Sequence, residues 1–325
     1  MICDRLFLFA SATRALAYRT NGSKRWMSAR PESKEAQVRK KVTIQKLNTL
    51  KQNGTPITML TAHDYPTGIR CELADIDITL VGDSLAQVAL GYDSTTRLTM
   101  DEMLHHIRAV GRGSHAPLLV ADLPFGTYYA STEDAVRSAV RMIREGGVEA
   151  VKIEGGRELV PTVKALTSVG IAVMAHIGLL PQRHTALSGY RVQGRDAASA
   201  IELAHAAEEL QNAGAFSIVL EAIPHLLAAH ITKKLHIPTI GIGAGPRCDG
   251  QVLVQDDALG IWSGHKAKFV RRFADIGVAA AAGVDAYAKA VKDGTFPAVE
   301  TESYGIDQGE WEKFVEHERV WTTKE

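Results

Sequence analysis

The chain has 325 residues, of which 46% are hydrophobic and 23% charged, a length that suits one large domain or two small ones. Lys and Arg together number 37, as do Asp and Glu, so no global positive field attracts polyanions and we expect no nucleic-acid partner. No apolar run approaches the ~20 residues that span a bilayer, and the three scattered cysteines form neither a disulfide framework nor a Cys-x-x-Cys zinc motif.

Residues 1–31 differ in composition from the rest of the chain. They contain six basic side chains, three serines and a single acid, Asp4, and Leu6, Phe7 and Phe9 give an apolar face. This pattern predicts a mitochondrial transit peptide, and therefore a protein of the mitochondrial matrix. A secretory signal is one alternative, although Arg14 interrupts its apolar segment, and a disordered tail is another. We expect residues 1–41 to be transit peptide and charged connector, 42–304 the catalytic domain and 305–325 a short tail.

The central region alternates between short apolar runs and helical patterns. Runs rich in Val, Ile and Leu predict strands that are buried on both faces; they are Ile57–Thr61, Ile78–Gly82, Leu118–Ala121, Ala150–Ile153, Ala172–Ala175, Ser217–Leu220 and Thr239–Ile242. Between them, helical patterns cover Met100–Gly111, Thr132–Arg144, Ala197–Gln211 and Pro224–Leu235. Asp101, Ser131 and Asp196 stand near predicted helix starts, where a side-chain oxygen can cap free amides. A further helix is expected over Glu310–Trp321.

Seven strand-and-helix units are readable, and Gln251–Ile261 supplies an eighth. Parallel units of this number and spacing favour a (βα)8 TIM barrel, with a doubly wound open sheet as the alternative. The glycine-rich stretch Gly241–Pro246 does not fit a dinucleotide-binding fingerprint, because Pro246 occupies the last glycine position. We interpret it as a tight turn that lets the backbone approach a ligand or a neighbouring strand.

Polar side chains stand where the predicted strands end. In a barrel these positions share one rim, the face that carries chemistry; they are Asp64, Asp83, Asp122, Lys152, Glu154, His176 and Glu221. One Asp after a strand is usually a helix cap. Several carboxylates packed together repel one another and raise one another's pKa, which a cation relieves. Oxygen donors favour Mg²⁺, with Mn²⁺ or another divalent ion as the alternative.

Four residues of this set suggest more specific roles. Lys152 and Glu154 lie two residues apart in a strand and therefore point to the same side, where the ammonium can hold an anionic substrate near a metal or form a structural ion pair. Glu221 follows an apolar run, which should raise its pKa and suit it to proton transfer near neutral pH. His176 is either a supporting polar group or a hydrogen-bonded core residue.

The sequence resembles the ketopantoate hydroxymethyltransferase family from about Val42 to Pro297. Long motifs in one order carry the resemblance: TMLTAHDYPT at Thr58–Thr67, LVGDSLAQVALGYDST at Leu80–Thr95, VADLPFGTY at Val120–Tyr128, VKIEGG at Val151–Gly156, HIGLLPQ at His176–Gln182, GYRVQGR at Gly189–Arg195, VLEAIP at Val219–Pro224 and IPTIGIGAGPRCDGQVLV at Ile237–Val254.

The resemblance implies a (βα)8 barrel that transfers a hydroxymethyl group from 5,10-methylene-tetrahydrofolate to 3-methyl-2-oxobutanoate, through a metal-stabilised enolate, in pantothenate biosynthesis. It implies Glu221 as proton acceptor, Asp83, Asp122 and Glu154 around the metal, and a substrate contacted by Asp83, Ser84, Asp122 and Lys152. It also implies a homo-oligomer. A metal-dependent lyase of a related 2-oxo acid on the same barrel is the competing activity, and a catalytically inactive binding protein is a further alternative.

Overall fold

The computed structural model describes residues 39–322 of the chain. The expected transit peptide lies outside the described residues and stays a prediction, as does most of the charged connector. From Thr43 onward the backbone is regular, because the Thr43 side chain accepts a hydrogen bond from the amide of Lys46 and caps helix α1 (Ile44–Gln52).

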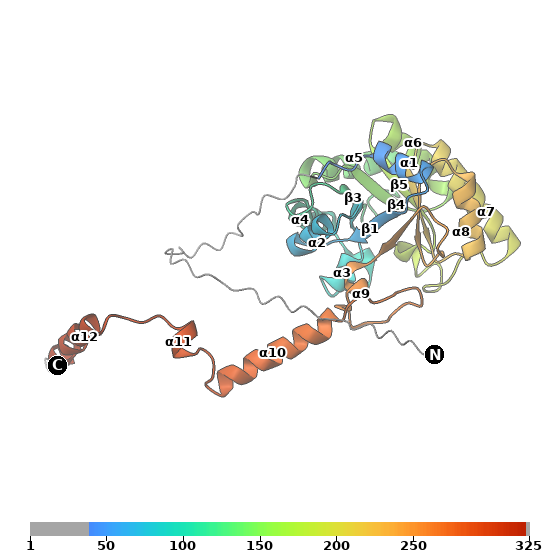
Figure 1. Cartoon of the computed structure of the whole chain (residues 1–325). Coiled ribbons are helices and arrows are strands. Elements are labelled where there is room, and N and C mark those ends of the chain that lie inside the picture. Colours follow the sequence, from blue (N-terminus) through green and yellow to red (C-terminus); the bar gives the residue numbers. More distant parts are fainter. Residues whose placement is uncertain (1–38, 323–325) are drawn as a thin grey trace, which may run out of the picture. The chain divides into compact units, whose positions relative to one another are not determined.

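Eight parallel strands form a closed barrel, in sequence order around the ring (Figure 1). The strands are β1 (Ile57–Thr61), β2 (Ile78–Val81), β3 (Leu118–Asp122), β4 (Ala150–Glu154), β5 (Ala172–Gly178), β6 (Ser217–Glu221), β7 (Thr239–Ile242) and β8 (Gly250–Leu253). Ile57 of β1 pairs with Gly250 of β8, which closes the ring. The predicted (βα)8 barrel is confirmed, and an open doubly wound sheet is wrong.

Helices follow most of the strands: α2 (Tyr65–Leu73), α3 (Leu85–Val88), α4 (Met100–Gly111), α5 (Thr132–Arg141), α6 (Val160–Ser168), α7 (Ala197–Asn212), α8 (His225–Lys234) and α9 (Gln255–Ala258). Ser131 and Asp196 are the predicted caps of α5 and α7. The prediction for Asp101 is wrong: Thr99 caps α4, while Asp101 lies within its first turn and pairs with Arg141. The caps explain where these helices begin.

Two apolar clusters fill the barrel region. One lies inside the ring, where Ile78, Val120, Met174 and Ile240 meet. The other lies between the strands and the surrounding helices and includes Leu104 and many further aliphatic side chains. Most strands are therefore buried on both faces, which explains their near-continuous apolar runs in the sequence, whereas Thr58 of β1 and Gln251 of β8 are exposed.

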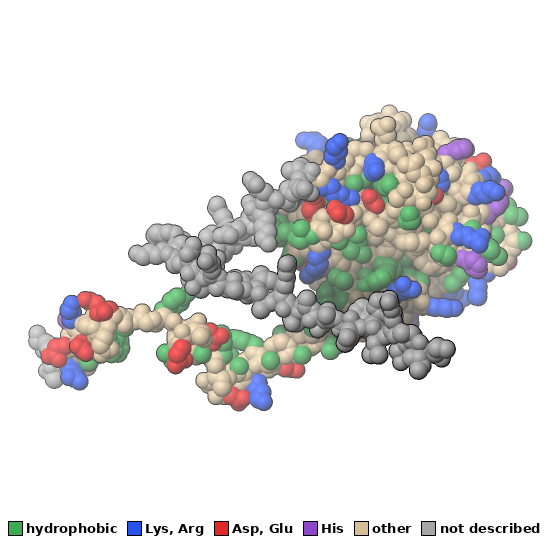
Figure 2. Space-filling view, in the orientation of Figure 1, with side chains coloured by type: hydrophobic (Ala, Val, Ile, Leu, Met, Phe, Trp, Pro, Cys, Tyr) green, Lys and Arg blue, Asp and Glu red, His purple; other side chains and the backbone are tan. Residues whose placement is uncertain are grey.

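The C-terminal elements are α10 (Ile276–Lys292), α11 (Val299–Glu302) and α12 (Gln308–Thr322). Helix α12 confirms the helix expected over Glu310–Trp321. Helix α10 has no buried residue. Within residues 39–322, no helix combines the length and apolarity needed to cross a membrane. Lys and Arg side chains are scattered over the visible face of the barrel (Figure 2).

Candidate active site

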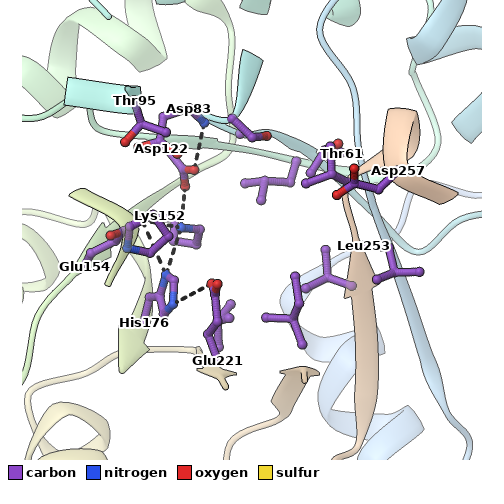
Figure 3. A pocket seen from close by; sticks show the side chains of 18 of the residues that line it. Thr61, Asp83, Thr95, Asp122, Lys152, Glu154, His176, Glu221, Leu253 and Asp257 are labelled. Carbon is purple, nitrogen blue, oxygen red and sulfur yellow. Dashed lines mark hydrogen bonds and ion pairs between the residues drawn. The ribbon is translucent and has the colours of Figure 1, made fainter. Parts of the chain in front are cut away.

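A pocket of about 180 Å³ opens at the carboxyl ends of the strands. Strands β2 to β6, with the short loops that follow them, deliver most of its polar side chains; these are Asp83, Ser84, Asp122, Lys152, Glu154, His176 and Glu221. All seven residues predicted for the site therefore line one pocket (Figure 3). Asp64, which also follows a strand, is absent from this lining and caps α2 through a capping box with Thr67.

Buried Lys152 lies at the centre of the polar set. Its Nζ is 2.8 Å from Oδ1 of Asp122 and 3.7 Å from Oε1 of Glu154. Burial alone would lower the pKa of Lys152, but the carboxylates of Asp122, Glu154 and Asp83 outweigh burial and raise it. Lys152 therefore remains an ammonium ion, as its place beside an anionic substrate would require.

His176 links the two ends of the polar set. Its Nδ1 is 3.2 Å from Nζ of Lys152 and 3.6 Å from Oε1 of Glu154, and its Nε2 is 3.2 Å from Oε2 of Glu221. Burial favours the neutral imidazole and the Lys152 ammonium opposes a second charge, yet the carboxylates raise the pKa of His176 to about 9. His176 lies within β5 rather than after it, since this strand continues to Gly178.

The backbone around Glu221 is unusually constrained. Gly178 ends β5 with a φ of +97°, and a Cβ there would lie 2.2 Å from the carbonyl oxygen of Glu221, so only glycine fits. Directly after Glu221, Ala222 adopts a φ of +46°, a conformation that costs a non-glycine residue about 1–3 kcal/mol. The fold tolerates this strain at the residue that places the Glu221 carboxylate against the pocket.

Asp83 lies across the pocket rim from Glu221 (Figure 3). Its amide donates to Oδ2 of Asp122 at 3.0 Å, so the loop after β2 and the end of β3 are tied together. Burial and the neighbouring carboxylates of Asp122 and Glu154 raise the pKa of Asp83 well above its ordinary range. This is the mutual repulsion that the spacing of the acids predicts.

Gln182 is a site residue to which the sequence analysis gave no role. Its Nε2 donates to Oδ2 of Asp83 at 2.9 Å and to the carbonyl of Leu123, while its backbone amide donates to Oε2 of Glu154 at 3.1 Å. The buried hydroxyl of Tyr128 donates to Gln182 Oε1 at 2.6 Å. Gln182 therefore holds two of the predicted acids at a fixed separation. The sequence offered one sign of this role, a glutamine within the HIGLLPQ motif. Glutamine side chains are rarely fully buried in proteins.

The donor set fits a hard divalent cation. The pocket holds the carboxylates of Asp83, Asp122, Glu154 and Glu221 against the cations Lys152 and His176. Among residues 39–322, buried Asp122 Oδ1 accepts no hydrogen bond and has only its ion pair with Lys152. No group of three acidic, His or Cys side chains in that part of the chain has the geometry to hold a metal. Mg²⁺ commonly takes one or two carboxylates and completes its shell with substrate oxygens and water, which suits Asp83 and Asp122. Glu154, the third predicted metal residue, contacts Lys152, His176 and the amide of Gln182, and its part in a metal site stays a prediction.

The opposite side of the pocket is different in character. Strand β7, strand β8 and the residue after β8 present an apolar wall there, made of Ile242, Val252, Leu253 and Val254, and β1 adds Thr61. Asp257 is the charged residue on this side, and Figure 3 shows it beside Thr61, across the pocket from Glu221. Burial and the neighbouring Asp256 raise the pKa of Asp257.

The family model described as ketopantoate hydroxymethyltransferase matches residues 41–299. The chain belongs to this family. A 3-methyl-2-oxobutanoate hydroxymethyltransferase of Heliobacterium modesticaldum is 51% identical over 268 residues, covering 82% of this chain and 97% of the relative. A protein of the same name from Emericella nidulans is 47% identical over 282 residues, covering 86% and 80%.

Solved structures similar to this member of the ketopantoate hydroxymethyltransferase family share its fold. A phosphonopyruvate hydrolase complex with oxalate and Mg²⁺ aligns with a TM-score of 0.53 and 14% identity, over 85% of this chain and 96% of that one. A 2,3-dimethylmalate lyase aligns with a TM-score of 0.51 and 18% identity, over 87% and 98%. The family match favours the transferase over the lyase expected as its competitor.

Proposed function

We propose that the protein transfers a hydroxymethyl group from 5,10-methylene-tetrahydrofolate to 3-methyl-2-oxobutanoate and forms 2-dehydropantoate, a step of pantothenate biosynthesis. The observation that carries the proposal is one pocket in which a buried ammonium, Lys152, lies among carboxylates while Glu221 faces the open space. A 2-oxo acid needs both features, because its carboxylate must be held while a proton leaves C3. The names of the relatives at about 50% identity support this substrate.

Lys152 and Ser84 bind the keto acid in this proposal. The Lys152 ammonium offsets the negative charge of the substrate carboxylate, and the Ser84 hydroxyl supplies a hydrogen-bond donor at the start of α3. Mg²⁺ held by Asp83 and Asp122 would act as a Lewis acid on the bound keto acid. Gln182 keeps Asp83 in place through the Nε2 hydrogen bond described above.

Glu221 is the proposed general base. Its side chain is 13% exposed, against 3% for the neighbouring His176, so it is the member of the pair that reaches the open pocket. Glu221 accepts the C3 proton, and the resulting enolate carbon attacks the methylene group of the folate. A carbon–carbon bond forms, the methylene–nitrogen bonds of the donor break, and water supplies the hydroxyl oxygen. Tetrahydrofolate leaves with the displaced nitrogens reprotonated.

Glu221→Gln tests this assignment. The amide keeps the shape of the side chain but cannot accept the proton, so deuterium exchange at C3 of 3-methyl-2-oxobutanoate should slow by roughly 10²–10⁴-fold, the usual effect of losing a general base. Exchange is followed by NMR in ²H₂O with Mg²⁺. Glu133→Gln, at an exposed position on α5, is the matched control and should exchange at the wild-type rate. Wild-type exchange in Glu221→Gln would exclude Glu221 as the base.

A turnover assay tests the reaction itself. The wild-type protein, 3-methyl-2-oxobutanoate, methylene-tetrahydrofolate and Mg²⁺ should yield 2-dehydropantoate, and a chelator should abolish its formation. No formation of 2-dehydropantoate, together with folate-independent cleavage of a carbon–carbon bond in a related 2-oxo acid, would favour the lyase alternative.

A further inference from the structure

One acid on the apolar side of the pocket has no direct contact with a donor in the described part of the chain. Within residues 39–322, the Asp257 carboxylate makes no hydrogen bond and no ion pair, although it is half-buried and lines the pocket; Arg272 attracts its charge only from beyond ion-pair distance. The nearby aliphatic side chains of Leu253 and Val254 cannot solvate it. A half-buried carboxylate directed toward the pocket in such surroundings calls for a ligand that brings its own donors.

The backbone that carries Asp257 is firmly anchored. Gln255, two residues earlier, is fully buried; its amide donates to Oγ1 of Thr61 at 3.0 Å and its Nε2 to the carbonyl of Thr61 at 3.0 Å. Arg70 donates to Gln255 Oε1 at 3.1 Å. These bonds fix α9 against the end of β1, so the position of Asp257 is set by the barrel rather than by a free loop.

An aromatic ring lies on the same side of the pocket. Phe269 lines the pocket and is 36% exposed. Its ring lies against Gly243, in the turn after β7, where an added Cβ would come within 2.7 Å of the ring and φ is +64°. The glycine-rich turn thus makes room for a neighbouring side chain, which gives the ring a fixed place at the pocket mouth.

We propose that Asp257 and Phe269 form the subsite for the bicyclic ring of the reduced folate, with the Asp257 carboxylate accepting hydrogen bonds from the 2-amino group and the adjacent ring N–H. This inference rests on the proposed function. Lys152 and the other charged groups hold the keto acid on one side, so the one-carbon donor must approach C3 from the remaining side. That side is the apolar wall on which Asp257 is the only charged group among the described lining residues.

The proposed subsite and the folate ring are chemically complementary. The pyrimidinone edge of the folate ring presents two parallel N–H donors, and a carboxylate accepts such a pair with both oxygens. The remaining ring surface is largely apolar and flat, which suits Phe269 and the aliphatic wall. Charged groups on the other side of the pocket would have to lose solvation to bind the same neutral ring.

Asp257→Asn tests the proposal in the full-length protein with Mg²⁺. One acceptor oxygen becomes a donor, so the KM for methylene-tetrahydrofolate and the Kd for tetrahydrofolate should rise about 10- to 100-fold. The KM for 3-methyl-2-oxobutanoate and the rate of folate-independent C3 deuterium exchange should stay within about twofold of wild type. Phe269→Ala should raise the same folate constants by roughly 2- to 10-fold. Asp285→Asn, at an exposed position on α10, is the control and should change none of them.

A modified ligand isolates the proposed contact. A tetrahydrofolate analogue with methyl in place of the 2-amino group should bind wild type more weakly than tetrahydrofolate, whereas Asp257→Asn should distinguish the two ligands much less. An unchanged Kd for tetrahydrofolate in Asp257→Asn, or an equal loss of C3 exchange, would overturn the subsite. A wild-type protein that exchanges the C3 proton but neither binds nor uses folate would instead overturn the proposed function.

Discussion

The two sides of the pocket use the same strand geometry for opposite purposes. From β2 to β6, the strand ends carry the charged groups, which are Asp83, Asp122, Lys152, Glu154, His176 and Glu221. From β7 through β8 to β1, the corresponding positions are Ile242, Leu253 and Thr61, and among the described lining residues of this side Asp257 is the one acid. The contrast teaches that the charged side suits the anion binding and proton transfer of the proposed function, while the apolar side suits the neutral ring of the proposed subsite.

The largest effect should come from removing the cation of the charged side. Lys152→Met leaves Asp122 and Glu154 buried without their ammonium, so we expect a loss of about 3–5 kcal/mol in the free energy of unfolding at pH 7. Urea denaturation measures it. Lys164→Met, at an exposed position on α6, is the control and should stay within about 0.5 kcal/mol of wild type.

The same variant has a defined pH dependence. Burial would raise the pKa of Glu154, but His176 and Lys152 outweigh it and lower the pKa to about 2, from an ordinary value of 4.5. A lowered pKa contributes stability above 4.5, and that contribution disappears as the pH falls toward 2. The difference between wild type and Lys152→Met should therefore be greatest near neutral pH and narrow below pH 4.5. A constant difference across that range would show that packing, not charge, explains the loss.

A smaller effect is expected from Gln182→Met, which keeps the volume but removes every side-chain hydrogen bond. Asp83 and Tyr128 then lose partners in a buried setting, at a cost of about 1–3 kcal/mol in unfolding free energy. Because Asp83 is also released, the Mg²⁺ affinity measured by titration calorimetry should fall. Reduced stability with unchanged Mg²⁺ affinity would limit Gln182 to a structural role.

The smallest effect is expected inside the barrel beneath the apolar wall. Ile240 of β7 is fully buried in the inner cluster, and Ile240→Val should cost about 0.5–1.5 kcal/mol in unfolding free energy. The charged side is untouched, so C3 deuterium exchange at 25 °C should match wild type. Slower exchange would mean that the two sides of the pocket are coupled through the core.

The barrel was predictable from sequence because seven of its eight strands are short apolar runs, most of them buried on both faces. The convergence of the charged residues followed from the rim that parallel strands share, and Lys152 and Glu154 do lie on one side of β4, 3.7 Å apart. Gln182 was not predictable, because its role depends on contacts with Asp83 and Glu154, which are distant in the sequence. Asp257 was equally hidden, since an acid near a short helix usually caps it.

The two smaller prediction errors, at the start of α4 and the end of β5, arise where the local sequence allows two structures. Thr99 and Asp101 both precede an apolar run, and only the backbone shows that Thr99 has the extended conformation of a cap. Strand β5 runs three residues further than the predicted segment Ala172–Ala175 because β6 continues beside it, pairing Gly178 with Glu221. In both cases an interaction with a neighbouring residue or strand selects one of the two structures that the local sequence allows.

The pairing of β1 with β8 bears on how the chain is made. Ile57 cannot meet its partner Gly250 until about 190 further residues have been synthesised, which takes roughly 10–40 s at ordinary ribosomal rates. Throughout that interval the outer edge of β1 has no native strand to pair with, and such an edge invites pairing with other chains. Protection of the nascent polypeptide by a chaperone is therefore most valuable between the emergence of the first strand and that of the last.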